Sequence, residues 1–259
     1  MDKMITFGII TNKGHHSSDQ EYRLSSFIDS VEKQNIPEYE ILIVGDYQSN
    51  RKSVKCIEFD ETIKPKWITK KKNIITQNAK YDIIVYLHDY IILDNYWYQG
   101  WLDFGWDNWD IAINIIINKD GTRFRYWVVF KYDGFISTHG VWKCSTLKCP
   151  DFPISPYIPS YLYDNYKNLY ISGSYWIAKK HVMIDEPLDE DFLWGVDRHG
   201  EDIEWSYRVL QKYKYVMNPL SAVKLLHQKD KVWSPIDPVY ISPEYIDAIY
   251  YNYHRNRNE

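Results

Sequence analysis

The sequence has few cysteines, no long apolar run and little excess charge. Its 259 residues include three cysteines, too few for a disulfide framework and without the Cys-x-x-Cys spacing of a zinc site. This favours a reducing, cytoplasmic setting, or the host cytoplasm if the chain is viral. No apolar stretch approaches the ~18 residues of a membrane span, and the apolar segment near the N-terminus is too short for a secretory signal. A soluble protein without a membrane span is therefore expected.

Charge also excludes a class of partner. The formal net charge is −4 and no basic stripe runs through the chain, so nucleic-acid binding is not expected. Aromatic residues are what the sequence has in abundance, 17% of the chain with 24 Tyr and 11 Trp. Core packing accounts for most of them in one interpretation. In the other, some line a saccharide cleft, where aromatic faces stack on sugar rings.

Strand-like and helix-like segments alternate in the first half of the chain. The apolar segments 4–10, 39–44, 54–59 and 82–87 are predicted strands, and helices are predicted after Ser17 and over 68–79. Such alternation indicates parallel β-α-β units in an α/β protein. Ligands of such sheets bind at the carboxyl ends of the strands. Polar residues follow three of these strands, namely Thr11, Asn12, Asp46, His88 and Asp89.

The second half is less regular. An Asp-Gly turn predicts a hairpin between 109–117 and 123–130, and residues 131–168 are predicted to form a long loop or lid. A strand over 169–177, a helix over 200–212, an extended segment over 215–226 and a terminal helix over 242–254 complete the prediction. No domain boundary is evident, so a single domain is expected.

Seven short motifs follow one another along residues 4–228. They are Ile9-Ile10-Thr11-Asn12, Val44-Gly45-Asp46, Lys71-Lys72-Asn73, Leu87-His88-Asp89-Tyr90, Ile171-Ser172-Gly173-Ser174, Pro187-Leu188-Asp189-Glu190 and Gly200-Glu201-Asp202-Ile203-Glu204-Trp205-Ser206. In this order the sequence resembles the GT-A glycosyltransferases, especially the family-2-like group. The resemblance implies a single α/β GT-A domain with a mixed central sheet. It divides the domain into a Rossmann-like nucleotide-binding half (1–107), an acceptor-binding half (108–230) and a C-terminal extension (231–259).

The same resemblance implies an activity. Enzymes of this kind transfer a hexose, here glucose or galactose, from a UDP-sugar to a hydroxyl of a glycan or glycosylated protein. They use Mn²⁺ or Mg²⁺, and a collagen-type glycosyltransferase of a large virus or bacterium is one member that fits. The sequence leaves the oligomeric state open, and a homodimer is one arrangement it allows.

The donor site implied by the resemblance comprises Thr11, Asn12, Asp46, Lys72, Asn73, Gly173 and Ser174. The backbone at Thr11 would frame the base, Asp46 would accept hydrogen bonds from the uracil or ribose, and the small Gly173 turn would lie under the sugar. Two alternatives stay open. Asp46 also suits a turn after a strand, and Lys71 and Lys72 suit a solvated helix face as well as they suit a diphosphate.

The metal motif departs from the family pattern, because His88-Asp89-Tyr90 replaces the usual Asp-x-Asp. Mn²⁺ and Mg²⁺ prefer hard oxygen ligands, and manganese also accepts imidazole. The resemblance therefore implies Asp89, His88 and His227 as metal ligands. The alternative is that both histidines are hydrogen-bonded interior residues.

An acidic cluster opens the helix predicted over 200–212. Glu201, Asp202 and Glu204 crowd like charges into one turn, which raises carboxylate pKa values and suits a general base. The resemblance makes Asp202 the base of an inverting reaction and gives Glu201 the binding of substrate hydroxyls. Some retaining enzymes carry a similar segment, and carboxylates also suit an ordinary helix start.

Two rival functions remain. A nucleotidyltransferase also uses a nucleotide-binding α/β fold with a metal, but it needs a glycine-rich phosphate loop, for which Thr11-Asn12-Lys13-Gly14 is a poor substitute. A catalytically degenerate carbohydrate- or nucleotide-binding protein would explain the lost second carboxylate at Tyr90.

Overall fold

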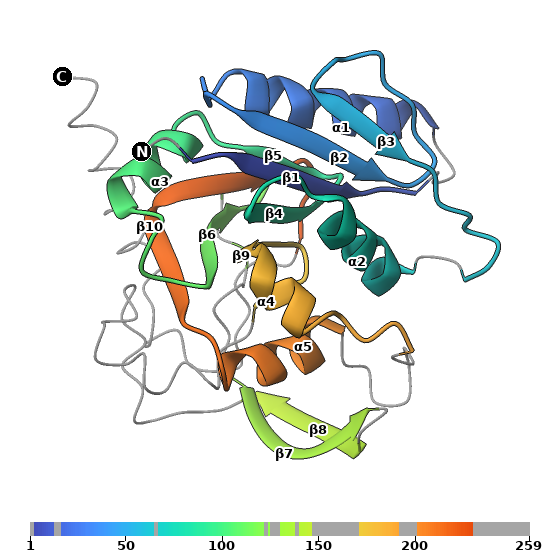
Figure 1. Cartoon of the computed structure of the whole chain (residues 1–259), viewed down its shortest axis with the longest axis vertical. Helices are drawn as coiled ribbons and strands as arrows, with labels where there is room; N and C mark the ends of the chain where they lie inside the picture. Colours follow the sequence, from blue (N-terminus) through green and yellow to red (C-terminus); the bar gives the residue numbers. More distant parts are fainter. Residues whose placement is uncertain are drawn as a thin grey trace.

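An eight-stranded mixed sheet with helices on both faces forms the centre of the molecule (Figure 1). The computed structural model describes residues 3–12, 17–64, 67–121, 124, 130–137, 140–146, 171–191 and 201–229. Within these residues the strand order of the sheet is β3-β2-β1-β4-β9-β6-β10-β5, and β7 and β8 form a separate two-stranded sheet.

The first half of the chain supplies the parallel side of the sheet. Its elements are β1 (Ile5–Ile10), α1 (Ser17–Glu32), β2 (Tyr39–Val44), β3 (Val54–Ile57), α2 (Ile68–Asn78) and β4 (Ile83–His88). β1 pairs in parallel with both β2 and β4, and β2 pairs in parallel with β3. The predicted β-α-β alternation is confirmed, and Ile10 and His88 are register partners at the ends of β1 and β4.

The second half completes the same sheet. Its elements are β5 (Ile91–Leu93), α3 (Trp97–Phe104), β6 (Ile111–Ile117), β7 (Phe130–Ser137), β8 (Gly140–Thr146), β9 (Tyr175–Lys179), α4 (Lys180–Asp185), α5 (Glu201–Leu210) and β10 (Tyr215–Leu225). β9 lies antiparallel between β4 and β6, and β10 pairs in parallel with β6 and antiparallel with β5. Because strands of the predicted halves 1–107 and 108–230 share one sheet, the chain is a single α/β domain with a mixed sheet.

Alternation along β1 separates the two helical layers. Phe7 contacts Phe27 of α1 and Trp97 of α3, with ring centroids 5.9 and 5.5 Å apart. Gly8 faces the opposite layer, where a Cβ atom would lie 2.2 Å from Ile75 Cγ2 of α2. Successive side chains of a strand point to opposite faces, so α1 and α3 cover one face and α2 covers the other.

Aromatic side chains fill much of this core. Tyr86 of β4 stacks on Trp176 of β9 at 4.9 Å, and Trp176 contacts Trp205 of α5 at 5.3 Å. Trp97 and Trp101 are also fully buried. The packing interpretation therefore accounts for these members of the large aromatic set.

Several predicted elements of the second half differ from the structure. The strand predicted over 169–177 begins only at Tyr175, because Ser172, Gly173 and Ser174 belong to a turn. Part of the predicted loop over 131–168 is the antiparallel pair β7 and β8. The predicted hairpin partner of β6, 123–130, is described only at Phe124, whose amide donates to Ile116 O, and at Phe130, the first residue of β7. The elements β5, α3 and α4 were not predicted.

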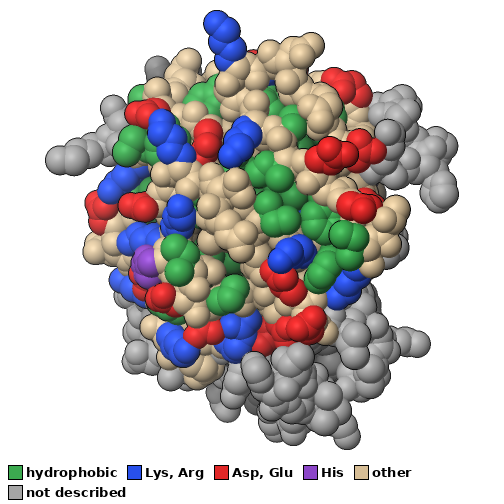
Figure 2. Space-filling view, turned by 45° about the vertical axis from the view of Figure 1, so that its right-hand side comes forward, with side chains coloured by type: hydrophobic (Ala, Val, Ile, Leu, Met, Phe, Trp, Pro, Cys, Tyr) green, Lys and Arg blue, Asp and Glu red, His purple; other side chains and the backbone are tan. Residues whose placement is uncertain are grey.

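Some predictions lie outside the described residues. These are the remainder of the proposed lid (147–168), the terminal helix over 242–254 and the extension 231–259. In the described part no helix is both long enough and apolar enough to cross a bilayer. On the face drawn in Figure 2, basic and acidic side chains of the described residues are interspersed, so no basic stripe crosses that face.

Candidate functional site

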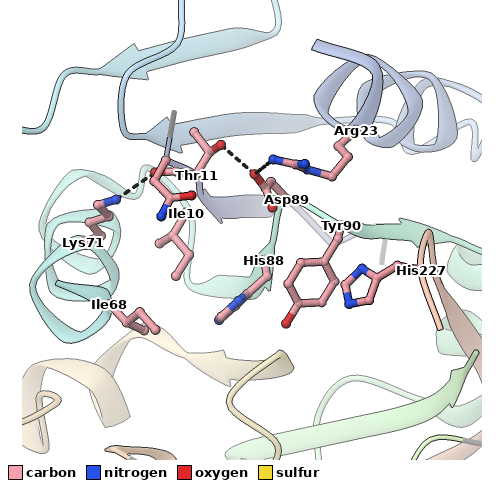
Figure 3. A pocket seen from close by; sticks show the side chains of 10 residues that line it. Ile10, Thr11, Arg23, Ile68, Lys71, His88, Asp89, Tyr90 and His227 are labelled. Carbon is pink, nitrogen blue, oxygen red and sulfur yellow. Dashed lines mark hydrogen bonds and ion pairs between the residues drawn. The ribbon is translucent and has the colours of Figure 1, made fainter. Parts of the chain in front are cut away.

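A pocket of about 410 Å³ opens at the carboxyl ends of β1 and β4. Five segments of the chain meet there: the residues after β1, α1, α2, the residues after β4 and the residues after β10 (Figure 3). The lining residues are Ile10, Thr11, Asn12, Arg23, Ile68, Lys71, His88, Asp89, Tyr90 and His227. This is the edge at which parallel sheets bind ligands.

Asp89 is held at the back of the pocket by two donors. Thr11 Oγ1 donates to Asp89 Oδ2 at 2.7 Å, and Arg23 Nη2 donates to the same oxygen at 3.0 Å (Figure 3). Gln20 Nε2 donates both to Thr11 Oγ1 at 2.9 Å and to the carbonyl of Asp46 at 3.2 Å. The ends of β1, β2 and β4 are thus joined through side chains of α1.

Lys71 forms another wall of the pocket from α2. Its Nζ donates to the carbonyl of Thr11 at 2.8 Å and forms an ion pair with Glu61. Lys71 is 2% exposed, so it is not part of a solvated helix face.

The third side of the pocket consists of two histidines around Tyr90. The ring of Tyr90 lies 5.2 Å from that of His88 and 4.4 Å from that of His227. Lys229 Nζ donates to Tyr90 Oη at 2.7 Å and to Ser174 Oγ at 2.8 Å. Tyr90, which replaces the usual second aspartate, therefore lies beside a cation.

Burial and nearby cations lower the pKa of both histidines. Burial lowers the pKa of His88 well below its usual value, and the charges of Lys72 and Lys229 add to this effect. Burial also lowers the pKa of His227, with Lys229 and Arg23 contributing and Asp89 opposing. Cations from several elements thus act together on this edge of the sheet.

The predicted metal ligands line one pocket without surrounding one point. Asp89 points toward Thr11 and Arg23 (Figure 3). The His88 side chain points away from Asp89, and His227 lies on the far side of Tyr90. The buried Nε2 of His88 has no hydrogen-bond partner. Within the described residues, no group of three or more His, Cys, Asp or Glu side chains is arranged to hold a metal ion. A magnesium ion is usually held by one or two carboxylates together with substrate phosphates. The one carboxylate in the described lining of the pocket, Asp89, is already paired with Arg23, so these residues fit a metal ion poorly.

The small-residue turn connects this pocket to the acidic pair. The amide of His88 donates to Ser174 O at 3.1 Å, and the amide of Gly173 donates to Asp202 Oδ2 at 2.8 Å. A Cβ atom on Gly173 would lie 2.5 Å from that carboxylate oxygen. Glycine is therefore required for α5 to approach the turn this closely.

Glu201 and Lys72 form a buried pair beneath the turn. Lys72 Nζ lies 3.8 Å from Glu201 Oε1, donates to Gly173 O at 2.8 Å and sits 4.3 Å from the centroid of the Trp176 ring. Burial lowers the pKa of Lys72 to about 8, although Glu201 and Asp202 oppose this effect. Burial raises the pKa of Glu201, the charge of Asp202 raises it further, and Lys72 opposes both. Lys72 does not line the pocket.

Glu204 has a different environment from the other two acidic residues. Arg208 of the same helix donates to Glu204 Oε2 at 3.0 Å and to Glu186 Oε2 at 2.6 Å. Arg208 thus joins α5 to the end of α4, and Glu204 holds Arg208 in place. The charge of Glu204 is satisfied structurally, so the crowding of acids in this turn is not itself a sign of catalysis.

The remaining predicted donor residues differ in their positions. Asn12 lines the pocket, whereas Asp46 is exposed and is not among the lining residues. Asn73 Nδ2 donates to Leu188 O at 2.8 Å and to Glu190 Oε1 at 2.9 Å, and its Oδ1 accepts from the amide of Leu188. Asn73 therefore secures the segment after α4.

Sequence reasoning missed Gln20, Arg23 and Lys229. Gln20 and Arg23 lie on a helix whose apolar face alone was evident, and Lys229 follows β10 without a motif of its own. No sequence pattern distinguishes Arg23 as a site residue, because an arginine on a helix is usually exposed to solvent.

Comparison with known proteins identifies the fold. No family model matches the chain, and no curated protein matches it. The structure is similar to GalNAc-T7 solved with UDP, GalNAc and Mn²⁺, with a TM-score of 0.54 and 17% identity over 96% of this chain and 50% of that chain. It is also similar to S. aureus TarS 1–349, with a TM-score of 0.52 and 10% identity over 97% of this chain and 70% of that chain. For S. aureus TarS 1–349 in complex with UDP-GlcNAc, the TM-score is 0.53 and the sequence identity is 12%. That match covers 98% of this chain and 65% of the TarS chain.

These likenesses establish the architecture. The chain has the GT-A fold in a single domain, as predicted. It spans half the length of the GalNAc-T7 chain and about two thirds of the TarS chain.

Proposed function

We propose that the chain is a glycosyltransferase that moves a sugar from a UDP-sugar to an acceptor hydroxyl. The GT-A fold supports this proposal, as do similar structures that contain UDP with GalNAc and Mn²⁺ in one case and UDP-GlcNAc in the other. From the sequence resemblance we further propose a hexose, glucose or galactose, and a glycan or glycosylated protein as acceptor, with collagen-type acceptors included. The low cysteine content supports work in a reducing compartment such as the cytoplasm.

One observation carries the proposal: a single turn joins the pocket to the acidic pair. Ser174 accepts a hydrogen bond from the end of β4, which lines the pocket, and Gly173 donates to Asp202. The turn and the acidic pair lie outside the residues that line the pocket, so the proposal requires the sugar of a bound nucleotide to extend from the pocket toward this turn. This is the arrangement that transfer from a nucleotide-sugar requires.

The reaction assigns a separate task to each member of the acidic pair. The acceptor oxygen attacks the anomeric carbon, the bond from that carbon to the β-phosphate oxygen breaks, and UDP leaves with the bonding electrons. Asp202 is half-buried and oriented by the Gly173 amide, so it takes the acceptor proton in an inverting reaction. Glu201 is 6% exposed and would bind a hydroxyl only at the floor of the site. In a retaining reaction Asp202 would position the substrate.

Mn²⁺ or Mg²⁺ is the cofactor that the resemblance implies, with Asp89, His88 and His227 as ligands. The steps proposed above use this chain's own residues, since Asp89, the one carboxylate in the described lining of the pocket, is paired with Arg23. When bound, a divalent cation would neutralise charge on the departing diphosphate.

Release of UDP from UDP-glucose and UDP-galactose tests the proposal. The full chain is expected to release UDP faster than the uncatalysed reaction, with water or a glycan as acceptor. The Asp202→Asn variant should bind UDP normally and turn over about 10²–10⁴-fold more slowly, the usual contribution of a general base. Asp103→Asn, which changes an exposed carboxylate on α3, is the matched control. NMR of the product's anomeric configuration separates the inverting from the retaining role.

A catalytically degenerate nucleotide-binding protein is the second candidate, favoured by the ion pair between Asp89 and Arg23. It predicts UDP binding without UDP release from any UDP-sugar. Near-normal turnover of a folded Asp202→Asn variant would instead remove the catalytic assignment and keep the enzyme.

A further inference from the structure

Two cations line the pocket at the ends of β1 and β4, and a third contacts one of its lining residues. Arg23 and Lys71 line it from α1 and α2, on either side of Thr11 (Figure 3). Lys229 approaches from the segment after β10, with Nζ 2.7 Å from Tyr90 Oη and 4.5 Å from the centroid of the Tyr90 ring. The cations thus come from three different segments of the chain: two line the pocket, and the third lies behind Tyr90, which lines it.

Two carboxylates act on these cations: Asp89 inside the pocket, and Glu61, which pairs with Lys71 from outside the described lining. Asp89 is the sole carboxylate among the described residues that line the pocket. Its Oδ2 atom accepts hydrogen bonds from Thr11 and from Arg23. An arginine this close repels a metal ion and competes for the carboxylate lone pairs that a metal ion would use. The position usually given to a cation cofactor is therefore next to a protein cation.

We propose that Arg23, Lys71 and Lys229 bind the diphosphate of the nucleotide-sugar directly, without a divalent cation. The inference rests on the proposed function and specifies how the donor's charge is neutralised. Arginine suits the task because its planar guanidinium donates two parallel hydrogen bonds to phosphate oxygens. Tyr90 and Ser174 hold Lys229 at the pocket wall beside the small-residue turn. The tyrosine in place of the second aspartate then has a role in placing a lysine.

Calorimetry with UDP on the full chain, in EDTA and in MnCl₂, tests the inference. The unaltered chain is expected to bind UDP with nearly the same affinity in both conditions. In EDTA, Arg23→Met and Lys229→Met should each weaken binding about tenfold or more, as for the loss of a charge-assisted contact. Lys229→Arg should retain most of the affinity. Mn²⁺ should partly restore binding to Arg23→Met, because that substitution releases Asp89.

Lys80→Met is the matched control. Lys80 forms an exposed ion pair with Glu38 before β4, at the opposite end of that strand from the pocket, so its loss should leave UDP affinity unchanged. Thermal melting checks that each variant is folded.

Two results would overturn the inference and leave the proposed function intact. One is UDP binding by the unaltered chain that is about tenfold or more tighter with Mn²⁺ than with EDTA. The other is unchanged UDP affinity in EDTA for both Arg23→Met and Lys229→Met. Absence of UDP binding in both conditions would overturn the proposed function together with the inference.

Discussion

Replacing Lys72 with methionine removes a buried cation from the point where α2, β9 and α5 meet. Lys72 is 1% exposed, and its Nζ lies 2.8 Å from Gly173 O and 3.8 Å from Glu201 Oε1. Methionine keeps much of the apolar stem but carries no charge. In the variant, the buried Glu201 carboxylate loses its cation while Asp202 remains beside it.

The expected loss of stability follows from the pair's burial. Unit charges about 4 Å apart attract by about 4 kcal/mol at an effective dielectric constant of about 20, and removing one partner of a buried pair costs about 3–5 kcal/mol. We therefore expect Lys72→Met to lower the free energy of unfolding by about 3–5 kcal/mol. Lys70→Met is the control on the same helix. Lys70 forms an ion pair with Glu190 at 2.8 Å, and both side chains are partly exposed. Loss of an exposed pair should lower the free energy of unfolding by only about 0–1 kcal/mol.

The effect should depend on pH. Burial already raises the pKa of Glu201, and Lys72 opposes that rise, so the variant should raise this pKa further. A folded state with a raised carboxyl pKa binds the proton more tightly than the unfolded chain, so its stability falls as pH rises through that pKa. The cost of the substitution is therefore small at acidic pH and complete near neutral pH. Above the Lys72 pKa of about 8, the unaltered chain loses the lysine charge too, and the difference shrinks.

Urea unfolding followed by tryptophan fluorescence measures these changes, since Trp176 and Trp205 lie beside the pair. The double variant Lys72→Met/Glu201→Gln removes both charges and should recover part of the loss, with a coupling energy of about 1 kcal/mol or more. Additive single effects, or a loss for Lys72→Met no larger than that for Lys70→Met, would refute the buried pair.

Three further predictions concern the packing around the site. Gly173→Ala would place a Cβ atom 2.5 Å from Asp202 Oδ2, so sugar transfer should fall about tenfold or more, and an unchanged rate would contradict the close approach of turn and helix. Gly8→Ala would place a Cβ atom 2.2 Å from Ile75 Cγ2 and should cost about 1–3 kcal/mol in urea unfolding. Adding Ile75→Ala should relieve that strain, and no relief would refute its cause. Glu204→Gln should lower the melting temperature, because Arg208 loses a charged partner, and should leave kcat unchanged. A loss of kcat like that of Asp202→Asn would contradict the structural role of Glu204.

Strand ends determine where several of the predicted site residues lie. Parallel strands end at one edge of a sheet, and the predicted site residues Thr11 and Asp89 are indeed hydrogen bonded there. Gly173 and Asp202, 29 positions apart, also meet. These residues were selected from an ordered series of motifs, which did not predict the contacts between them. Whether these residues perform the implied roles stays a prediction.

The cations were harder to predict because their environment is set by tertiary packing. Lys70, Lys71 and Lys72 form one basic run in the sequence, yet Lys70 is partly exposed while the other two are buried. A helix turns by about 100° per residue, so neighbours in such a run face different surroundings. Nothing local distinguishes the lysine that lines the pocket from the one beneath the acidic pair.

Short elements and the turn before β9 were missed for a similar reason. β5 has three residues and α4 has six, too few to show a period. The segment before Tyr175 is apolar enough to suggest a strand, but the Gly173 amide donates to Asp202 and the Ser174 carbonyl accepts from His88. Contacts across long sequence separations therefore decided the local structure.

The acidic turn of α5 shows why like-charge crowding is a weak guide to a catalytic group. Glu201 lies beside Lys72, and Glu204 is hydrogen bonded to Arg208. These two carboxylates are 6% and 3% exposed, so each is buried with a cation of its own. Asp202 is only half-buried, and the Gly173 amide donates to its carboxylate. Since a general base must reach its substrate, access favours Asp202, where the count of acidic residues could not.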